Sequence, residues 1–172
     1  MKQAKGNMLN IDCDALVITT NGYVKRDGSC VMGRGCAKQV ADLVPEIPFM
    51  LGAAIKKHGN RVNFIMHQVN TNIDLISYPV KPVMVVNNGT NLVNHMAKRV
   101  KIGDSIGGWA AKATMELIIE MAWELSEMAD NNPQWKNIIL PRPGCGAGEL
   151  TWEQVEPHLT VILDDRFTCY TY

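Results

Sequence analysis

The chain has 172 residues, of which 47% are hydrophobic, and its 17 basic residues are balanced by 17 acidic ones. This length is enough for one domain with a sizeable core, so we expect a single domain over residues 1–172. A net charge of zero argues against a general nucleic-acid-binding protein, which needs a surplus of basic residues. We therefore expect no nucleic-acid partner.

The five cysteines are odd in number, form no C-x-x-C pair and have no zinc-like spacing with histidine. We interpret them as reduced thiols of a cytoplasmic protein that holds no metal. The N-terminal residues lack the apolar segment of a signal peptide, and no apolar run approaches the roughly 18 residues of a membrane span. We expect a cytoplasmic monomer that has no cofactor and no contact with a membrane.

The first half of the chain contains apolar runs of strand length and segments with helical spacing. The most nearly continuous apolar run, residues 14–20, predicts a strand that is covered on both faces. Strands are predicted at residues 2–9, 14–20, 62–69 and 73–78, and helices at residues 37–44 and 49–58. The strands at 62–69 and 73–78 are close enough in sequence to form a hairpin.

The second half has its least regular part at residues 82–108, which we expect to be an inserted loop or hairpin near the site. Pro157 is expected to end or kink the last helix. Helices are predicted at residues 109–129 and 151–163, and strands at residues 136–141 and 167–172. Alternating strands and helices favour a three-layer α/β/α sandwich with a mixed central sheet.

Two of the predicted strands are followed by a glycine-rich loop and then by a helix. The first glycine loop is Met32–Ala37, and the second glycine loop is Leu140–Leu150, which holds three glycines within five residues. Thr151 and Gln154 then form a capping box at the next helix start. Backbone N–H groups in such loops can bind anions, and ligands of α/β sheets lie at the carboxyl ends of strands. Two neighbouring loops suit a diphosphate, whereas each loop alone could be a tight turn.

Four segments together resemble the macrodomains, the ADP-ribose-binding fold. The family motifs are G-D-I, D-A-I-V-N-A-A-N, M-G-x-G-I-A and P-R-x-G-C-G followed by L-x-W. The matching segments are Gly6–Leu9, Asp14–Asn21, Met32–Ala37 and Pro141–Gly146 with Leu150 and Trp152. The last two motif versions resemble the branch of terminal ADP-ribose protein glycohydrolases and small phage-type proteins that process ADP-ribose 1″-phosphate.

The resemblance implies that ADP-ribose or a related nucleotide is the ligand. Asn7 replaces the family's adenine-binding Asp, and its amide oxygen can accept the same hydrogen bond. Asn21 takes the place of the family's ribose-binding Asn, although Asn21-Gly22 is also a turn dipeptide. The ligand-binding residues implied are Asn7, Met8, Asn21, Gly33, Arg34, Gly35, Cys36, Ala37, Pro143, Gly144, Cys145, Gly146, Ala147 and Gly148.

The candidate catalytic residues are Asn21, Asp27, Lys81 and Glu149. Asp27 is the one carboxylate of the loop after Asn21, and Lys81 lies near the position of the glycohydrolases' catalytic lysine. Glu149 directly follows Gly148, which stands where the glycohydrolases carry an Asp. Ala37 likewise stands where other hydrolytic macrodomains carry an Asp.

Two hypotheses remain open at this point. The first is a hydrolase that acts on ADP-ribose 1″-phosphate or on ADP-ribose esterified to a protein carboxylate. The second is a module that binds or sequesters ADP-ribose or another NAD-derived nucleotide without catalysis. The glycine loops fit both, and the two missing Asp residues favour the second somewhat.

Overall fold

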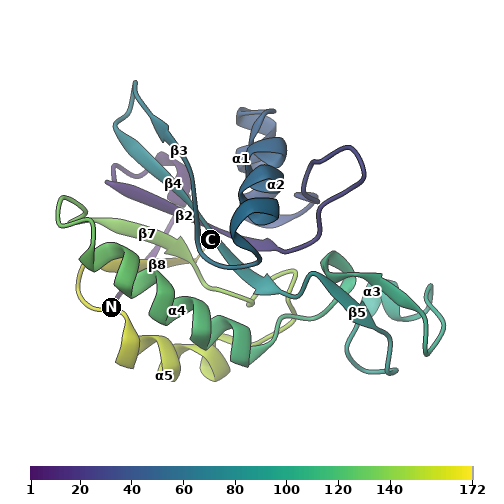
Figure 1. The fold of residues 1–172 in the computed structure, drawn as a ribbon. Coiled ribbons are helices and arrows are strands. Elements are labelled where there is room, and N and C mark those ends of the chain that lie inside the picture. Colours follow the sequence, from purple (N-terminus) through teal and green to yellow (C-terminus); the bar gives the residue numbers. More distant parts are fainter. Residues whose placement is uncertain (172) are drawn as a thin grey trace.

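The centre of the molecule is a mixed six-stranded sheet with the order β1-β8-β7-β2-β4-β3 (Figure 1). The computed structural model describes residues 1–171, so the last position of the strand predicted over 167–172 lies outside the described residues. The strands are β1 (Lys2–Lys5), β2 (Ala15–Asn21), β3 (Asn63–Gln68), β4 (Ile73–Lys81), β7 (Ile138–Pro141) and β8 (Phe167–Thr171). Only the edge strand β3 is antiparallel to its neighbour.

Helices cover both faces of the sheet, as predicted (Figure 1). One face carries α1 (Gly35–Leu43) and α2 (Ile47–His58), and the other carries α4 (Met115–Asp130) and α5 (Trp152–Ile162). Neighbouring strand residues face opposite sides, since Val17 packs in the core under α4 and α5 and Ile18 packs in the core under α1 and α2. The three-layer α/β/α sandwich is therefore confirmed.

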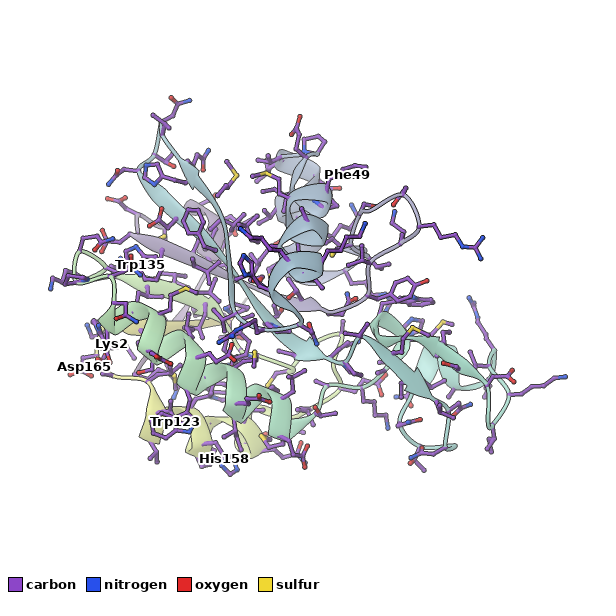
Figure 2. All side chains as sticks on the ribbon, in the orientation of Figure 1. Lys2, Phe49, Trp123, Trp135, His158 and Asp165 are labelled. Carbon is purple, nitrogen blue, oxygen red and sulfur yellow. The ribbon has the colours of Figure 1, made fainter. Side chains whose placement is uncertain are left out.

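The outer surfaces of both helix layers also expose aromatic side chains. Phe49 on α2 is 53% exposed and Trp123 on α4 is 58% exposed, and both project outward (Figure 2). Trp135, by contrast, is buried and donates a hydrogen bond of 2.7 Å to Asp74. No helix in residues 1–171 combines the length and the apolar character needed to cross a membrane.

The N-terminal prediction of one strand over residues 2–9 is wrong beyond Lys5. Gly6 has a φ of 143°, which turns the chain out of the sheet, and Met8–Asn10 then forms a 3₁₀ helix, η1. The Asn7 side chain caps η1 by accepting a hydrogen bond of 3.1 Å from the Leu9 N–H.

Residues 82–111 form a small unit that projects from the sandwich, here called the β5–β6 lobe (Figure 1). It contains a two-stranded antiparallel sheet of β5 (Met84–Val86) and β6 (Ser105–Gly107), the short helix α3 (Asn94–Ala97) and the 3₁₀ helix η2 (Gly108–Ala110). Its own core consists of Leu92, Val93, Met96 and Ala110. Such a small core stabilises the lobe only weakly by itself.

One helix prediction needs correction, and one of the two effects expected of Pro157 is excluded. The helix predicted from Trp109 begins only at Met115, because the Ala113 and Thr114 N–H groups donate to the carbonyls of Gly148 and Val80 instead of to a helix. Pro157 does not end α5, which continues to Ile162 with Val155 and Leu159 buried on either side of the proline. The capping box of Thr151 and Gln154 is present as predicted.

Candidate functional site

A cavity of about 840 Å³ opens at the carboxyl ends of the parallel strands. Its floor runs across the ends of β8, β7, β2 and β4, a distance of three strand spacings, or roughly 14 Å. After β2 the chain adds β3 and β4 on one side of β2, whereas the later strands β7 and β8 lie on the other side. The cavity therefore lies where the strand order reverses, which is the place where α/β sheets bind ligands. Its elongated floor suits a ligand with several units in a row.

The first glycine loop forms one wall of the cavity. Gly33 and Gly35 line it, and an added Cβ at either residue would meet no heavy atom within 4 Å. Gly35 has a φ of 60° and begins α1, whose first N–H groups have no acceptor within the helix. This end of α1 can therefore bind an anion. Cys36 is buried in the same turn, and burial raises its pKa, so its thiol stays protonated.

The second glycine loop forms the opposite wall, and its glycines differ in function. Gly146 lines the cavity and has open space at its Cβ position. Gly144 has a φ of 75°, and a Cβ there would lie 2.7 Å from Ile118 Cδ1. A Cβ at Gly148 would lie 2.5 Å from the Gly144 carbonyl oxygen, so no larger residue fits at 148 without a backbone shift. An Asp at this position, which the resemblance to glycohydrolases would lead us to expect, therefore has no room without that shift.

Lys81 ends β4 and lies between the two walls. Its side chain is buried, and Nζ donates to the Ala147 carbonyl at 2.7 Å and to the Trp109 carbonyl at 3.3 Å. Burial is the main reason that the pKa of Lys81 is lowered to about 8; Glu149 opposes this shift, and the nearby Arg34 adds to it. Near neutral pH this amine can therefore exchange its proton.

Asn21 lines the cavity and also shapes the loop that follows β2. Its Nδ2 donates to the Val31 carbonyl at 2.8 Å, and its Oδ1 accepts from the Tyr23 N–H at 3.0 Å. The amide retains one N–H and one lone pair beyond these bonds. The turn contacts and a contact with a ligand are thus compatible.

Several cavity residues were not predicted from the sequence, and four of them come from the β5–β6 lobe. His95, Met96, Arg99 and Trp109 form this part of the lining. Desolvation is the main reason that the pKa of His95 is lowered, and the charges of Arg34 and Arg99 lower it further. These effects show that several cationic side chains lie close together at the β4 end of the cavity. The basic run at residues 98–101 was the only signal for this wall in the sequence.

At the β8 end, Arg142 and Trp152 complete the lining. The Arg142 guanidinium stacks on the Trp152 ring at 4.7 Å from the ring centroid. Gln3 Oε1 accepts hydrogen bonds from both side chains, at 3.2 Å and 2.9 Å. This flat, fixed surface can hold a planar ring, because stacking on such surfaces needs no directional hydrogen bonds.

Five residues predicted for the site do not line the cavity: Asn7, Met8, Asp27, Pro143 and Glu149. Met8 packs in the core with 1% of its side chain exposed. Asp27 is exposed and accepts hydrogen bonds from the Ser29 N–H and hydroxyl at 2.9 and 2.7 Å, which are the main reason that its pKa is lowered. Its carboxylate closes a turn away from the cavity.

The remaining predicted site residues do line the cavity together: Asn21, Gly33, Arg34, Gly35, Cys36, Ala37, Lys81, Gly144, Cys145, Gly146, Ala147 and Gly148. Cys145 is half-buried, and burial raises its pKa to about 11, so its thiol is protonated at neutral pH. The lining, within residues 1–171, contains no Asp or Glu. Nor do the described residues include a cluster of three or more His, Cys, Asp or Glu that could hold a metal ion.

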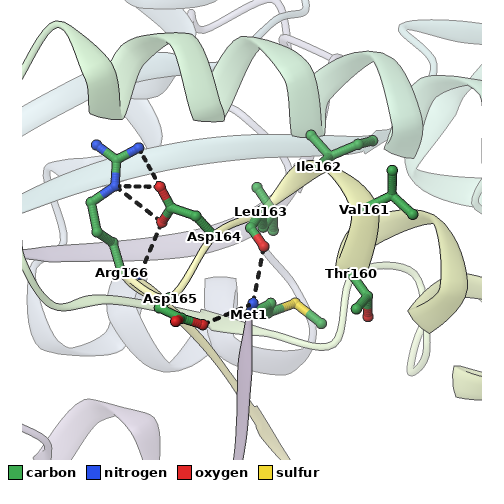
Figure 3. A pocket seen from close by; sticks show the side chains of 8 residues that line it. All are labelled: Met1, Thr160, Val161, Ile162, Leu163, Asp164, Asp165 and Arg166. Atoms are coloured by element: carbon green, nitrogen blue, oxygen red, sulfur yellow. Dashed lines mark hydrogen bonds and ion pairs between the residues drawn. The ribbon is translucent and has the colours of Figure 1, made fainter.

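A second hollow, of about 510 Å³, lies where α5 ends and β8 begins (Figure 3). Its charged groups already have partners, since Arg166 pairs with Asp164 at 2.7 Å and the Met1 amino group donates to the Leu163 carbonyl at 3.0 Å. It lies at the amino ends of β1 and β8, where ligands of α/β sheets do not bind. We assign no ligand to it.

Comparison with known proteins gives structural but not sequence matches. No family model matches the chain, and no curated protein matches its sequence. The macrodomain of Mycobacterium tuberculosis DarG superimposes with a TM-score of 0.71 at 20% identity, covering 99% of this chain and 97% of that one. The macrodomain of Thermus aquaticus DarG gives a TM-score of 0.68 at 20% identity, with coverages of 99% and 96%.

A third solved structure, Thermosipho africanus DarTG in complex with ADP-ribose, gives a TM-score of 0.69 at 17% identity. The match covers 98% of this chain and 41% of that longer one. At these identities the likeness concerns the fold, and it agrees with the sheet order and helix layers described above. The chain has the macrodomain fold.

Proposed function

We propose that this protein binds ADP-ribose in the cavity and hydrolyses an ADP-ribose derivative, either ADP-ribose 1″-phosphate or ADP-ribose esterified to a protein. The observation that carries the proposal is the buried Lys81 amine between two glycine loops, at one end of an elongated cavity. A solved structure with the same fold contains ADP-ribose, which supports the choice of ligand.

The order of residues along the cavity suggests how ADP-ribose would lie. The Arg142–Trp152 surface at the β8 end suits the adenine ring. The glycine loops in the middle offer backbone N–H groups to the diphosphate. The distal ribose would then reach Asn21 and Lys81 at the ends of β2 and β4.

The hydrogen bonds of Lys81 are compatible with a chemical role. A neutral amine has two N–H groups and one lone pair, and the carbonyls of Trp109 and Ala147 accept two N–H groups. The lone pair then remains for the substrate, where it can take a proton or attack the anomeric carbon while the leaving group departs. With a pKa of about 8, a useful fraction of Lys81 is neutral at physiological pH.

A non-catalytic binding module is the alternative, and one observation favours it. The cavity lining has no carboxylate within the described residues, so no carboxylate can act as a second acid or base beside Lys81. In this alternative the Lys81 amine only holds the Ala147 and Trp109 segments in place.

Calorimetry and turnover assays on wild type, Lys81→Arg and Lys81→Met separate these possibilities. We expect wild type to bind ADP-ribose with a micromolar Kd and to hydrolyse at least one of the two substrates. Lys81→Arg keeps the charge but cannot become neutral, so it should retain most of the binding and lose about 10²-fold or more in turnover. The absence of binding at millimolar ADP-ribose would refute the ligand, and binding without turnover of either substrate would leave the binding module.

A further inference from the structure

Glu149 has an unusual backbone conformation. Its φ is 62°, in the left-handed region, where a residue with a Cβ is strained by about 1–2 kcal/mol. Asn72 is the one other non-glycine residue with positive φ in residues 1–171, and it lies between β3 and β4, where Asn is well tolerated. A charged residue held in this conformation beside a binding cavity calls for a compensating contact.

The Glu149 side chain makes such a contact with the β5–β6 lobe. Its Oε1 accepts a hydrogen bond of 2.7 Å from the Asn94 N–H, across 55 residues of sequence. Its Oε2 lies 4.0 Å from Lys112 Nζ at the base of the lobe. Both carboxylate oxygens are thus directed to groups outside the cavity lining.

Asn94 is the first residue of α3, and α3 supplies part of the cavity wall. His95 and Met96 lie on this helix, and Arg99 lies two residues beyond its end. Because α3 has only four residues and the lobe has a small core, we expect contacts with the sandwich to help fix where these side chains lie. Glu149 provides one contact of this kind, and Lys81 provides another through the Trp109 carbonyl.

We propose that Glu149 is a positioning residue that holds α3 against the second glycine loop, so that His95 and Arg99 face the bound ligand. The orientation of His95 and Arg99 toward the ligand rests on the proposed function, whereas the contact between Glu149 and α3 does not. The hydrogen bond from the Asn94 N–H offsets the backbone strain of Glu149. Its carboxylate does not act as the acid or base of the reaction.

Two substitutions test this role. Glu149→Gln keeps an oxygen that can accept from the Asn94 N–H, but it cannot act as an acid or base. Glu149→Gly removes the side chain and at the same time relieves the strained φ. Three properties would be measured for both variants and for wild type: hydrogen exchange of residues 94–99 in the ligand-free proteins, thermal unfolding and ADP-ribose affinity by titration. Lys112→Gln is the control for the ion pair.

We expect Glu149→Gly to unfold at the wild-type temperature or above it, yet to exchange faster at residues 94–99 and to bind ADP-ribose about tenfold more weakly. Glu149→Gln and Lys112→Gln should stay close to wild type in all three measurements. Unchanged exchange in Glu149→Gly would overturn the proposal, and so would equal losses in Glu149→Gln and Glu149→Gly. Faster exchange in Glu149→Gly together with no ADP-ribose binding by wild type would support the hold on α3 and refute the proposed ligand instead.

Discussion

Substitution of Gly146 by Glu tests whether the second glycine loop binds the diphosphate. Gly146 is exposed, lines the cavity and has no heavy atom within 4 Å of the position that a Cβ would take. The fold should therefore tolerate the new side chain, with a change in unfolding free energy within about 0.5 kcal/mol. The same side chain would extend into the space where we place the phosphates.

The expected loss of affinity follows from charge repulsion. A carboxylate about 6 Å from one phosphate charge costs about 2.8 kcal/mol at an effective dielectric constant of about 20. This corresponds to about a hundredfold increase in Kd, and the second phosphate would add to it. Gly146→Gln has nearly the same size without the charge, so the difference between the two variants isolates the electrostatic part.

Isothermal titration calorimetry with ADP-ribose gives the affinities, and thermal denaturation shows whether each variant is folded. Added salt should narrow the gap between Gly146→Glu and Gly146→Gln, because it screens the repulsion. A folded Gly146→Glu variant with wild-type affinity would show that the diphosphate lies elsewhere.

Three further outcomes are expected. Gly144→Ala should lower the unfolding free energy by about 3 kcal/mol in urea, since φ is 75° there and the new Cβ would lie 2.7 Å from Ile118 Cδ1; an unchanged midpoint would contradict this. Asn21→Ala should lower the unfolding free energy by about 2 kcal/mol, because the Val31 carbonyl and the Tyr23 N–H lose their partner. It should also reduce turnover by about 10²-fold; full activity would show that Asn21 is a turn residue only. The pKa of Lys81 is about 8 in the folded protein and 10.5 when unperturbed. Between pH 8 and 10.5 the unfolded chain therefore binds more protons than the folded protein, and the stability of wild type relative to Lys81→Met should rise with pH. A constant difference between the urea stabilities of the two proteins from pH 7 to 10 would refute that pKa.

The sandwich was largely predictable because its signals are local. The apolar run before Asn21, the glycines after β7 and the capping box at Thr151 each occupy only a few consecutive residues. Such patterns indicate strand–loop–helix units without knowledge of their partners. The two glycine loops of the cavity were found in this way.

The cavity wall from the β5–β6 lobe was not predictable, because its residues are placed by distant contacts. α3 has four residues and β5 and β6 have three each, which is too short for a periodic pattern. The apolar residues before Met115 mimic helical spacing, but backbone bonds to Gly148 and Val80 keep Ala113 and Thr114 out of the helix. Asp27 does not line the cavity, and its carboxylate instead accepts a hydrogen bond from the Ser29 N–H. The sequence around Asp27 did not predict this local contact.

The position of β1 at the edge of the sheet has a consequence for folding. β1 pairs only with β8, whose residues lie about 166 positions further along the chain. Pairing β1 with β8 before the rest of the sheet forms would therefore cost about 4.5 kcal/mol of chain entropy beyond a constant, and β1 offers little in return because most of its four side chains are exposed. Because β8 is its neighbour in the sheet, β1 becomes part of the assembled sheet only when β8 has joined β7. We therefore expect β1 to join the sheet late in folding and to be among the first strands to detach when the protein opens.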